Sequence, residues 1–249
     1  MVRFEGEPPS YLVYEGLEAA GVRHAFTTRH HGNIMAVSHP GGPFAKAGPA
    51  LSALGIDGGA VYCARQVHGV ECLVADDRPP GVVGTGDALA TGRPGVPLAV
   101  FTADCVAVVL ADPERRALAV AHAGWRGTVG GILGHLVGLL ATRFGARPAR
   151  LRAAIGPSIG PCCYEVDEPV VAPLGRAFPA DWRRWVTPRG EGKWMLDLWQ
   201  ANADQLVATG VLRGRIDNPR LCTACRTDLF FSYRREGPRR RLASLAMLT

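Results

Sequence analysis

The feature that most constrains the fold is residues 101–128, two apolar runs joined by one short charged segment. The stretch is FTADCVAVVLADPERRALAVAHAGWRGT. Asp112 followed by Pro113 favours a type I turn in the charged segment, so the stretch predicts an antiparallel β-hairpin. A hairpin centred on that turn places Cys105 opposite His122 on one face of the sheet, with Cβ atoms about 5 Å apart.

Cys105 and His122 are therefore expected at the separation of two ligands of one metal ion. A cysteine and a histidine can share a sheet face by chance, but an imidazole buried between apolar strands needs a polar partner. His68, in the segment RQVHG, supplies a third candidate from a neighbouring strand or loop. Two histidines and one cysteine with an open fourth position are typical of a catalytic zinc site.

The same three ligand types also form the trigonal site of blue copper, so they leave the metal open. Blue copper takes a weak axial methionine, and multicopper centres need many histidines in His-X-His pairs. The methionines are Met1, Met35, Met195 and Met247, and the other histidines are His24, His30, His31, His39 and His135. No methionine is adjacent to the three candidates in sequence and no His-X-His pair occurs. We therefore expect zinc rather than copper.

A glycine-rich segment, GWRGT, follows His122 and opens a helix expected over residues 125–144. Its glycines either let backbone N–H groups approach an anion, with Arg126 adding charge, or only permit close packing of the helix on the sheet. Asp104, which precedes Cys105, either orients a ligand or transfers a proton, or else supports its loop.

Length and composition restrict the class of protein. A chain of 249 residues with 47% hydrophobic residues and no linker or repeat is expected to form one domain over residues 1–249. The longest apolar run, residues 95–111, contains a proline and an aspartate, and the N-terminus lacks a signal-peptide core, so we expect a cytoplasmic protein without a membrane segment. Seven cysteines, an odd number, argue against a disulfide framework. The net charge of +6 suits anionic small molecules, phosphate or nucleic acid.

The other expected elements mix strands and helices without strict alternation. Strands are expected over residues 24–29, 97–110, 117–123 and 150–156, and residues 60–75 are a β-rich stretch. Helices are expected over residues 49–56, 125–144, 167–178 and 197–209, the last with Asp197 as its N-cap and Gly210 just beyond its end. A hairpin over residues 228–248 closes the chain. This order favours an α+β fold with a layered mixed sheet.

Seven motifs occur in order from about residue 60 to the C-terminus. They are RQVHG, GDALAT, TADC, AHAGWRGT, AIGPSIGPCCYEV, a helix with the pattern DL…N…L…G, and CT…FFSYRR. Together they resemble the YfiH-like laccase-domain family, formerly called multicopper polyphenol oxidases. The resemblance implies a three-layer α/β sandwich with a mixed sheet, and a zinc site formed by His68, Cys105 and His122. It also implies phosphorolysis of adenosine, inosine and methylthioadenosine, deamination of adenosine, and in bacterial members a peptidoglycan-editing role.

The resemblance further implies which residues contact a purine nucleoside and phosphate. These candidates are Arg29, Arg65, Gln66, Arg126 and Arg241. Arg29 ends HAFTTR, which resembles the family's opening strand, and Arg241 falls where the family has a Gly-Arg pair. The zinc-deaminase signature is absent, so the proton-transfer residue is unassigned, with Asp104 as a candidate. The protein is expected to be a monomer or a homodimer.

Residues 30–50 depart from the family pattern. The family has a Gly-Gly-Val-Ser turn, a Leu-Asn-Leu-Gly segment and an Asn-Arg pair, whereas this chain is shorter here and has Lys46-Ala47 at the place of that pair. If the arginine of the pair holds phosphate, Lys46 or Arg29 must supply the charge in this chain.

Three alternatives remain open from the residues alone. Cys105 as a nucleophile with His122 as its base would give a thiol hydrolase or a peptidoglycan-precursor editing enzyme. Cys162-Cys163 and the CxxC of residues 222–225 could form a structural zinc site, although adjacent cysteines rarely both bind one ion. The basic run over residues 234–241, beside Tyr233, suits nucleic acid, but such runs are usually solvated loops and no RNA-binding motif accompanies it. We therefore expect no nucleic-acid partner.

Overall fold

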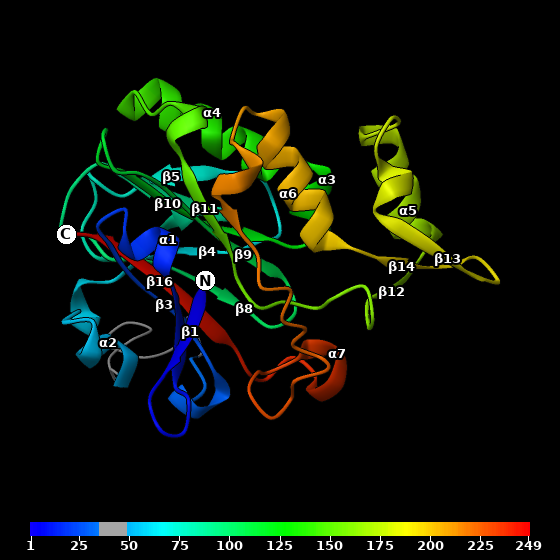
Figure 1. Cartoon of the computed structure of the whole chain (residues 1–249), viewed down its shortest axis with the longest axis horizontal. Coiled ribbons are helices and arrows are strands. Elements are labelled where there is room, and N and C mark those ends of the chain that lie inside the picture. Colours follow the sequence, from blue (N-terminus) through cyan, green and yellow to red (C-terminus); the bar gives the residue numbers. More distant parts are fainter. Residues whose placement is uncertain (35–48) are drawn as a thin grey trace.

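The computed structural model describes residues 1–34 and 49–249, so Lys46-Ala47 and most of the divergent segment lie outside the described residues (Figure 1). Two β-sheets pack face to face. The first sheet has the order β1 (Val2–Glu5), β2 (Tyr11–Tyr14), β3 (Val22–Thr27), β16 (Leu242–Leu248), β8 (Leu98–Thr102), β4 (Tyr62–Arg65) and β6 (Gly81–Thr85). The second sheet has the order β15 (Ile216–Asp217), β11 (Arg152–Ile155), β9 (Val106–Asp112), β10 (Ala117–Ala123), β7 (Ala88–Thr91) and β5 (Cys72–Val74).

Apolar side chains fill the space between the two sheets. Leu98 and Val100 of the first sheet belong to one buried cluster with Val109 and Leu118 of the second. Burying one such aliphatic side chain contributes about 1.5–3 kcal/mol, so this layer is a major part of the hydrophobic stabilisation. Every residue of β9 and β10 is buried because both faces of the second sheet are covered, which explains their unbroken apolar sequence.

Helices cover the outer faces. α3 (Trp125–Val129), α4 (Ile132–Phe144) and α6 (Leu198–Ala208) pack on the outer face of the second sheet, and α2 (Pro49–Ala53) lies on the first (Figure 1). A small sheet of β12 (Glu165–Asp167), β14 (Lys193–Leu196) and β13 (Val186–Gly190) carries α5 (Glu168–Ala177). The remaining elements are short: the α-helices α1 (Glu15–Glu18) and α7 (Tyr233–Glu236), and the 3-10 helices η1 (Arg29–His31), η2 (Gly58–Ala60), η3 (Pro148–Arg150), η4 (Trp182–Arg184) and η5 (Arg213–Arg215). The expected α+β class with layered, mixed sheets is confirmed.

The predicted hairpin of β9 and β10 is confirmed, but its register differs from the prediction by two residues. Asp112 pairs with Ala117, so the turn contains residues 113–116 and is longer than a type I turn. Asp112 shapes it by accepting the N–H groups of Glu114 and Arg115. His122 therefore lies opposite Ala107 rather than opposite Cys105. Cys105 lies just before β9, in the turn that follows β8, and its sulfur is nevertheless within 4.8 Å of the ring nitrogen of His122.

Three other predicted elements are corrected. The strand expected over residues 97–110 is two strands in different sheets, β8 and β9, separated by a turn in which Asp104 has φ +81°. The helix expected over residues 125–144 is divided at Gly131, which has φ +73° and caps α4. The closing hairpin was wrong, because α7 occupies its first half and β16 pairs with β3 and β8 instead.

The path of the chain between the sheets positions the site. β8, β4 and β6 are neighbouring parallel strands of the first sheet, so all three leave it at the same end. Each then passes into the second sheet, to β9, β5 and β7. The three crossing segments are residues 103–105, 66–71 and 86–87. The side chains on these segments therefore meet at one end of the sandwich.

No helix within the described residues is both long enough and apolar enough to cross a membrane.

Candidate active site and metal centre

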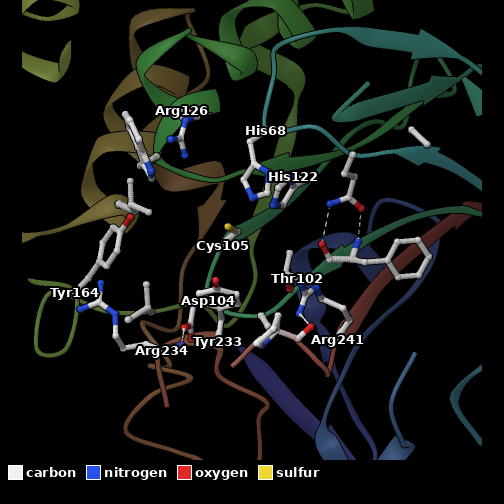
Figure 2. Close-up of a pocket in the computed structure, with 18 of the residues that line it drawn as sticks. His68, Thr102, Asp104, Cys105, His122, Arg126, Tyr164, Tyr233, Arg234 and Arg241 are labelled. Atoms are coloured by element: carbon white, nitrogen blue, oxygen red, sulfur yellow. Dashed lines mark hydrogen bonds between the residues drawn. The ribbon is translucent and has the colours of Figure 1, made fainter. Parts of the chain in front are cut away.

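His68, Cys105 and His122 meet where the three segments cross between the sheets (Figure 2). Their candidate ligand atoms all lie within 4.8 Å of one another. The two imidazole rings meet edge to face with their centroids 4.8 Å apart. His68 and Cys105 come from crossing segments and His122 from the end of β10. The structure thus brings together the three residues that the sequence singled out.

Asp87, on the third crossing segment, organises both histidines. Its fully buried carboxylate accepts the backbone N–H groups of Val67 at 3.1 Å, His68 at 3.0 Å and Gly69 at 2.8 Å. It also lies 2.7 Å from His122 Nδ1. Because an ionised carboxylate only accepts hydrogen bonds, His122 donates Nδ1–H and its Nε2 is left as the ligand atom. His68 needs this support, since its φ of +60° is unfavourable for a residue with a side chain.

The charges of the cluster favour a thiolate. Burial alone raises the pKa of the Cys105 thiol, but His122 and His68 beside it lower that pKa to about 6. Burial alone lowers the pKa of His122, but Cys105 and Asp87 raise it to about 9. The pKa of Asp87 is also below its usual value, because the His122 hydrogen bond and the backbone N–H groups outweigh burial. A soft anionic sulfur between two imidazoles suits a divalent transition metal such as zinc.

Gly124 permits the close approach of Cys105 and His68. A Cβ at this position would lie 3.0 Å from Cys105 Sγ and 3.1 Å from the Cδ2 atom of His68. A Cβ on Gly127 would lie 3.2 Å from the Gly69 carbonyl oxygen. The glycines after His122 therefore allow the start of the helix to pack closely, as the packing interpretation of the GWRGT segment had it, but against the cluster and the segment of Gly69 rather than only against the sheet.

A cavity of about 640 Å³ opens over the three candidate ligands. Figure 2 shows Arg126 and Tyr164 on one side of it and Arg241 on the other. Its charged lining residues are Arg65, Arg126, Arg234, Arg241 and Asp104, and its aromatic ones are Phe101, Trp125, Tyr164 and Tyr233. The wall is cationic and aromatic, which suits a ligand with an anionic group and a flat ring.

The single carboxylate in this lining is occupied by the chain itself. Asp104 accepts the hydroxyl of Thr223 at 2.6 Å, the hydroxyl of Ser232 at 3.0 Å and the N–H of Arg234 at 2.7 Å. These bonds hold the turn that carries Cys105 from one sheet to the other. The arrangement matches the loop-supporting alternative for Asp104.

Some of the predicted substrate-contact side chains have no hydrogen-bond partner among the described residues, and others are already hydrogen-bonded within the protein. Arg65 and Arg126 line the cavity, and neither guanidinium forms a hydrogen bond or ion pair with another described residue; Arg126 lies over the Trp125 ring at 4.2 Å. Gln66 also lines the cavity, but its amide bonds both to the N–H and to the carbonyl of Phe101, at 2.7 and 2.8 Å, and so joins β4 to β8.

Arg29 and Arg241 are placed differently from each other. Arg29 is not among the cavity-lining residues. It bonds to the Thr227 carbonyl, pairs with Glu236 at 2.8 Å and stacks on Phe231, which anchors the segment before α7. Arg241 lines the cavity, although its Nη1 is bonded to the carbonyls of residues 238 and 240.

Sequence reasoning missed four residues at this site: Asp87, Tyr164, Tyr233 and, as a cavity residue, Arg234. Asp87 carried a signal, because a single aspartate before the apolar segment ALAT needs partners when it is buried. Tyr164 follows the cysteine pair, and no local pattern indicates that it faces the cavity. The basic run that includes Arg234 does not form one charged face, since Arg235 bonds to the Ala224 carbonyl and Arg240 stacks on Phe231.

The structure also assembles the four cysteines of the structural-zinc alternative. The sulfurs of Cys162, Cys163, Cys222 and Cys225 all lie within 4.8 Å of one another. The adjacency of Cys162 and Cys163 therefore does not keep either of them from the cluster, contrary to the objection raised from the sequence.

The family can now be assigned. A family model described as multi-copper polyphenol oxidoreductase laccase matches residues 47–249. The chain belongs to this family. The crystal structure of Bacillus licheniformis hypothetical protein YfiH superposes with a TM-score of 0.89 at 32% identity, covering 99% of both chains. The expected family and its fold are confirmed.

Curated relatives of this chain carry names that state an activity. The purine nucleoside phosphorylase YlmD of Geobacillus stearothermophilus is 42% identical over 186 residues, which span 70% of this chain and 66% of that protein. The adenosine deaminase RL5, from an unknown prokaryotic organism, is 38% identical over 192 residues, spanning 74% of this chain and 73% of that protein.

Proposed function

We propose that this chain is a zinc-dependent purine nucleoside phosphorylase that acts on adenosine, inosine and methylthioadenosine and also deaminates adenosine. The names of its relatives support the chemistry. The donor set of His68, Cys105 and His122 supports zinc, because Zn²⁺ binds imidazole nitrogen and thiolate sulfur and leaves a fourth position open in catalytic sites. When bound, the ion would supply Lewis-acid polarisation at the floor of the cavity.

The observation that carries phosphorolysis is the charge of the cavity wall. Four arginines line it, whereas its one carboxylate, Asp104, is already held by three hydrogen bonds. Arg65 and Arg126 are the best candidates for phosphate, since their guanidinium groups have no polar partner among the described residues. A guanidinium pairs with phosphate through two parallel N–H donors, which would orient one phosphate oxygen toward the ribose C1′.

The aromatic residues supply the place for the base. Trp125, Tyr164 and Tyr233 lie around the same cavity, whose volume of about 640 Å³ is in the usual range for small-molecule sites. In phosphorolysis a phosphate oxygen bonds to C1′ as the C1′–N9 bond breaks, and the departing purine takes up a proton. Burial raises the pKa of Tyr164, so its hydroxyl stays protonated at neutral pH and is able to donate a hydrogen bond to a purine nitrogen.

The test is phosphate dependence. Purified protein is incubated with adenosine, inosine or methylthioadenosine, with and without phosphate. The free base and the sugar 1-phosphate are measured, which is ribose 1-phosphate from the first two and methylthioribose 1-phosphate from the third, and inosine is measured as the deamination product of adenosine. We expect release of free base that requires phosphate and is lost when a zinc chelator is added, and restored by zinc. Base release that is independent of phosphate, or complete absence of turnover with all three nucleosides, would contradict phosphorolysis.

One observation favours a second candidate, a thiol hydrolase. Cys105, His122 and Asp87 also have the arrangement of a catalytic triad, with Cys105 as nucleophile, His122 as base and Asp87 as the carboxylate that orients the base. In metal-free protein the pKa of about 6 makes Cys105 a thiolate at pH 7, whereas Cys72, whose pKa burial raises to about 12, stays protonated. Iodoacetamide labelling followed by peptide mass spectrometry should therefore find Cys105 labelled and Cys72 unlabelled. A metal-free protein that keeps its activity until Cys105 is labelled would favour this second candidate over the zinc enzyme.

A further inference from the structure

A second cluster of metal-ligand side chains lies outside the cavity lining, between two loops. Cys162 and Cys163 lie in the loop after β11, and Cys222 and Cys225 lie in the loop after β15. We propose that these four cysteines bind a structural zinc ion, separate from the His68–Cys105–His122 cluster, and that this ion fixes the loops that hold Cys105 in place.

The distances between the sulfurs fit one shared ion. Cys225 Sγ lies 3.4 Å from Cys162 Sγ and 3.4 Å from Cys163 Sγ. Tetrahedral zinc with Zn–S bonds of about 2.3 Å separates its sulfurs by about 3.8 Å, which is close to this arrangement. A disulfide joins only two sulfurs, at about 2.05 Å. Cys225 is equally close to two partners, and Cys222 completes the group, so a four-way arrangement is favoured over a pair.

Local backbone structure explains how adjacent cysteines both face the same point. The N–H groups of Cys163 and Tyr164 both bond to the Gly160 carbonyl at 2.9 Å, which makes a tight turn. Gly160 cannot be replaced easily, because a Cβ there would lie 2.3 Å from the Trp199 ring. On the other loop, the N–H of Arg226 bonds to the Cys222 carbonyl at 3.0 Å and closes the CxxC turn.

Donors beside two of the four sulfurs, those of Cys222 and Cys163, favour the anionic form of these two. The N–H of Gly160 points to Cys222 Sγ at 3.2 Å, and Arg235 Nη2 lies 3.8 Å from Cys163 Sγ. Hydrogen bonds of this kind to ligating sulfurs are the usual outer support of cysteine metal sites. Arg235 also adds a positive charge beside a group that would be negative when four thiolates bind one divalent ion.

The two loops that carry the cysteines hold the turn before Cys105, so an ion that joins the loops would help to position Cys105. Ser158 and Cys222 form a parallel bridge between the loops. The N–H of Ile159 bonds to the Asp104 carbonyl at 2.9 Å, and the Thr223 hydroxyl bonds to the Asp104 carboxylate at 2.6 Å. Both loops thus hold the turn that leads into Cys105. With four protein ligands no position stays open for substrate, so the ion would position the site without taking part in the reaction.

The test counts zinc in the full chain, purified without added metal, by elemental analysis. It compares the wild type, His122→Ala, the double variant Cys162→Ser/Cys225→Ser, and all three changes together. Cys162 and Cys225 are exposed, so serine there should not disturb the core, and Cys72→Ser is the control for losing a cysteine outside both clusters. We expect about two zinc ions per chain in the wild type and in Cys72→Ser. We expect about one in His122→Ala, about one in Cys162→Ser/Cys225→Ser, and none when all three changes are combined.

The outcomes separate this inference from the proposed function. Zinc that is lost with His122→Ala but is unchanged in the double cysteine variant overturns the structural site and leaves the catalytic one standing. Zinc that is lost in the double cysteine variant but unchanged in His122→Ala supports the structural site and contradicts zinc binding at the His68–Cys105–His122 cluster. Cobalt reconstitution is a second measurement, since a four-thiolate site gives stronger thiolate-to-cobalt charge-transfer absorption than a site with one thiolate. A zinc-free wild type with a disulfide among the four cysteines, detected by intact mass under non-reducing conditions, also overturns the inference.

Discussion

The two clusters that can hold a metal differ in donors, position and surroundings. His68, Cys105 and His122 lie where the chain crosses between two sheets, with a buried carboxylate behind them and a cavity in front. The four cysteines lie between two loops and face one another, with two of them exposed. Catalytic zinc sites keep one coordination position open, whereas structural zinc sites do not. The number of protein donors and the presence of a cavity, rather than the identity of the metal, therefore distinguish a catalytic role from a structural one.

Removing one ligand from each cluster gives the largest expected contrast. His68→Asn should lower the rate of base release by on the order of 10³-fold, because a residue of the proposed reaction centre is lost, while asparagine tolerates the left-handed φ of this position. Cys225→Ser should lower it by no more than about 10-fold and mainly lower the melting temperature. Steady-state kinetics and thermal unfolding measure both. Equal losses of activity in the two variants would remove the distinction between the clusters.

Replacing the carboxylate behind the histidines should have the next largest effect. Asp87→Asn should weaken metal binding or activity by about 10–100-fold, because the amide cannot accept hydrogen bonds at both ends as the carboxylate does. Asp204→Asn is the matched control, since Asp204 is also mostly buried and accepts from Trp185 and Gln200, away from the cavity. The control should lose stability but keep its zinc affinity, measured by competition with a chelator.

How far the sequence predicts the structure depends on how local the cause is. The strands of the hairpin, the N-cap at Asp197 and the proximity of Cys105 to His122 follow from short-range patterns and were predicted. The register was wrong because Asp112 accepts two backbone N–H groups and lengthens the turn. The division between β8 and β9 was missed because both halves are equally apolar, and only long-range partners of Asp104 show that the chain changes sheets there.

The same limit applies to the site. His68 was singled out because its motif and residue type suggest a ligand. Asp87 and Tyr164 lie at the site only because the fold brings them beside residues that are distant in sequence. Arg29 was assigned to phosphate by resemblance, and the structure places it on Glu236 and Phe231 instead of in the cavity wall. A site residue whose type and local motif suggest its role is therefore easier to predict than one that the fold alone brings to the site.

A smaller effect is expected from filling the space beside the ligands. Gly124→Ala should cost about 1–3 kcal/mol of stability and reduce zinc affinity, because its Cβ would press on Cys105 and His68. Gly138→Ala is the control, since a Cβ there meets nothing within 4 Å in the middle of α4 and should stabilise the protein by about 0.4–1 kcal/mol. Denaturant unfolding and chelator competition measure both. A Gly124→Ala variant with normal zinc affinity would mean that the ligands have room to move.

The smallest expected effect separates two arginines. Arg126→Gln should raise the KM for phosphate by roughly 10-fold, since a charged hydrogen bond contributes about 1.5–3 kcal/mol. Arg29→Gln should leave that KM unchanged and lower stability by about 1 kcal/mol or less, because its ion pair with Glu236 is partly exposed. Initial rates over a range of phosphate concentrations decide between them. A KM that changes only in Arg29→Gln would restore the assignment made by resemblance.

The crossing of the chain between the sheets has a consequence for motion. His68 and Cys105 lie on segments that leave the first sheet, and His122 belongs to the second. An ion held by all three would oppose any separation of the two layers at this end, because separation would break bonds to the metal. Local opening there would then become linked to metal release. Amide hydrogen exchange in β4 and β9 should slow on zinc binding and report occupancy of the site independently of any enzymatic assay.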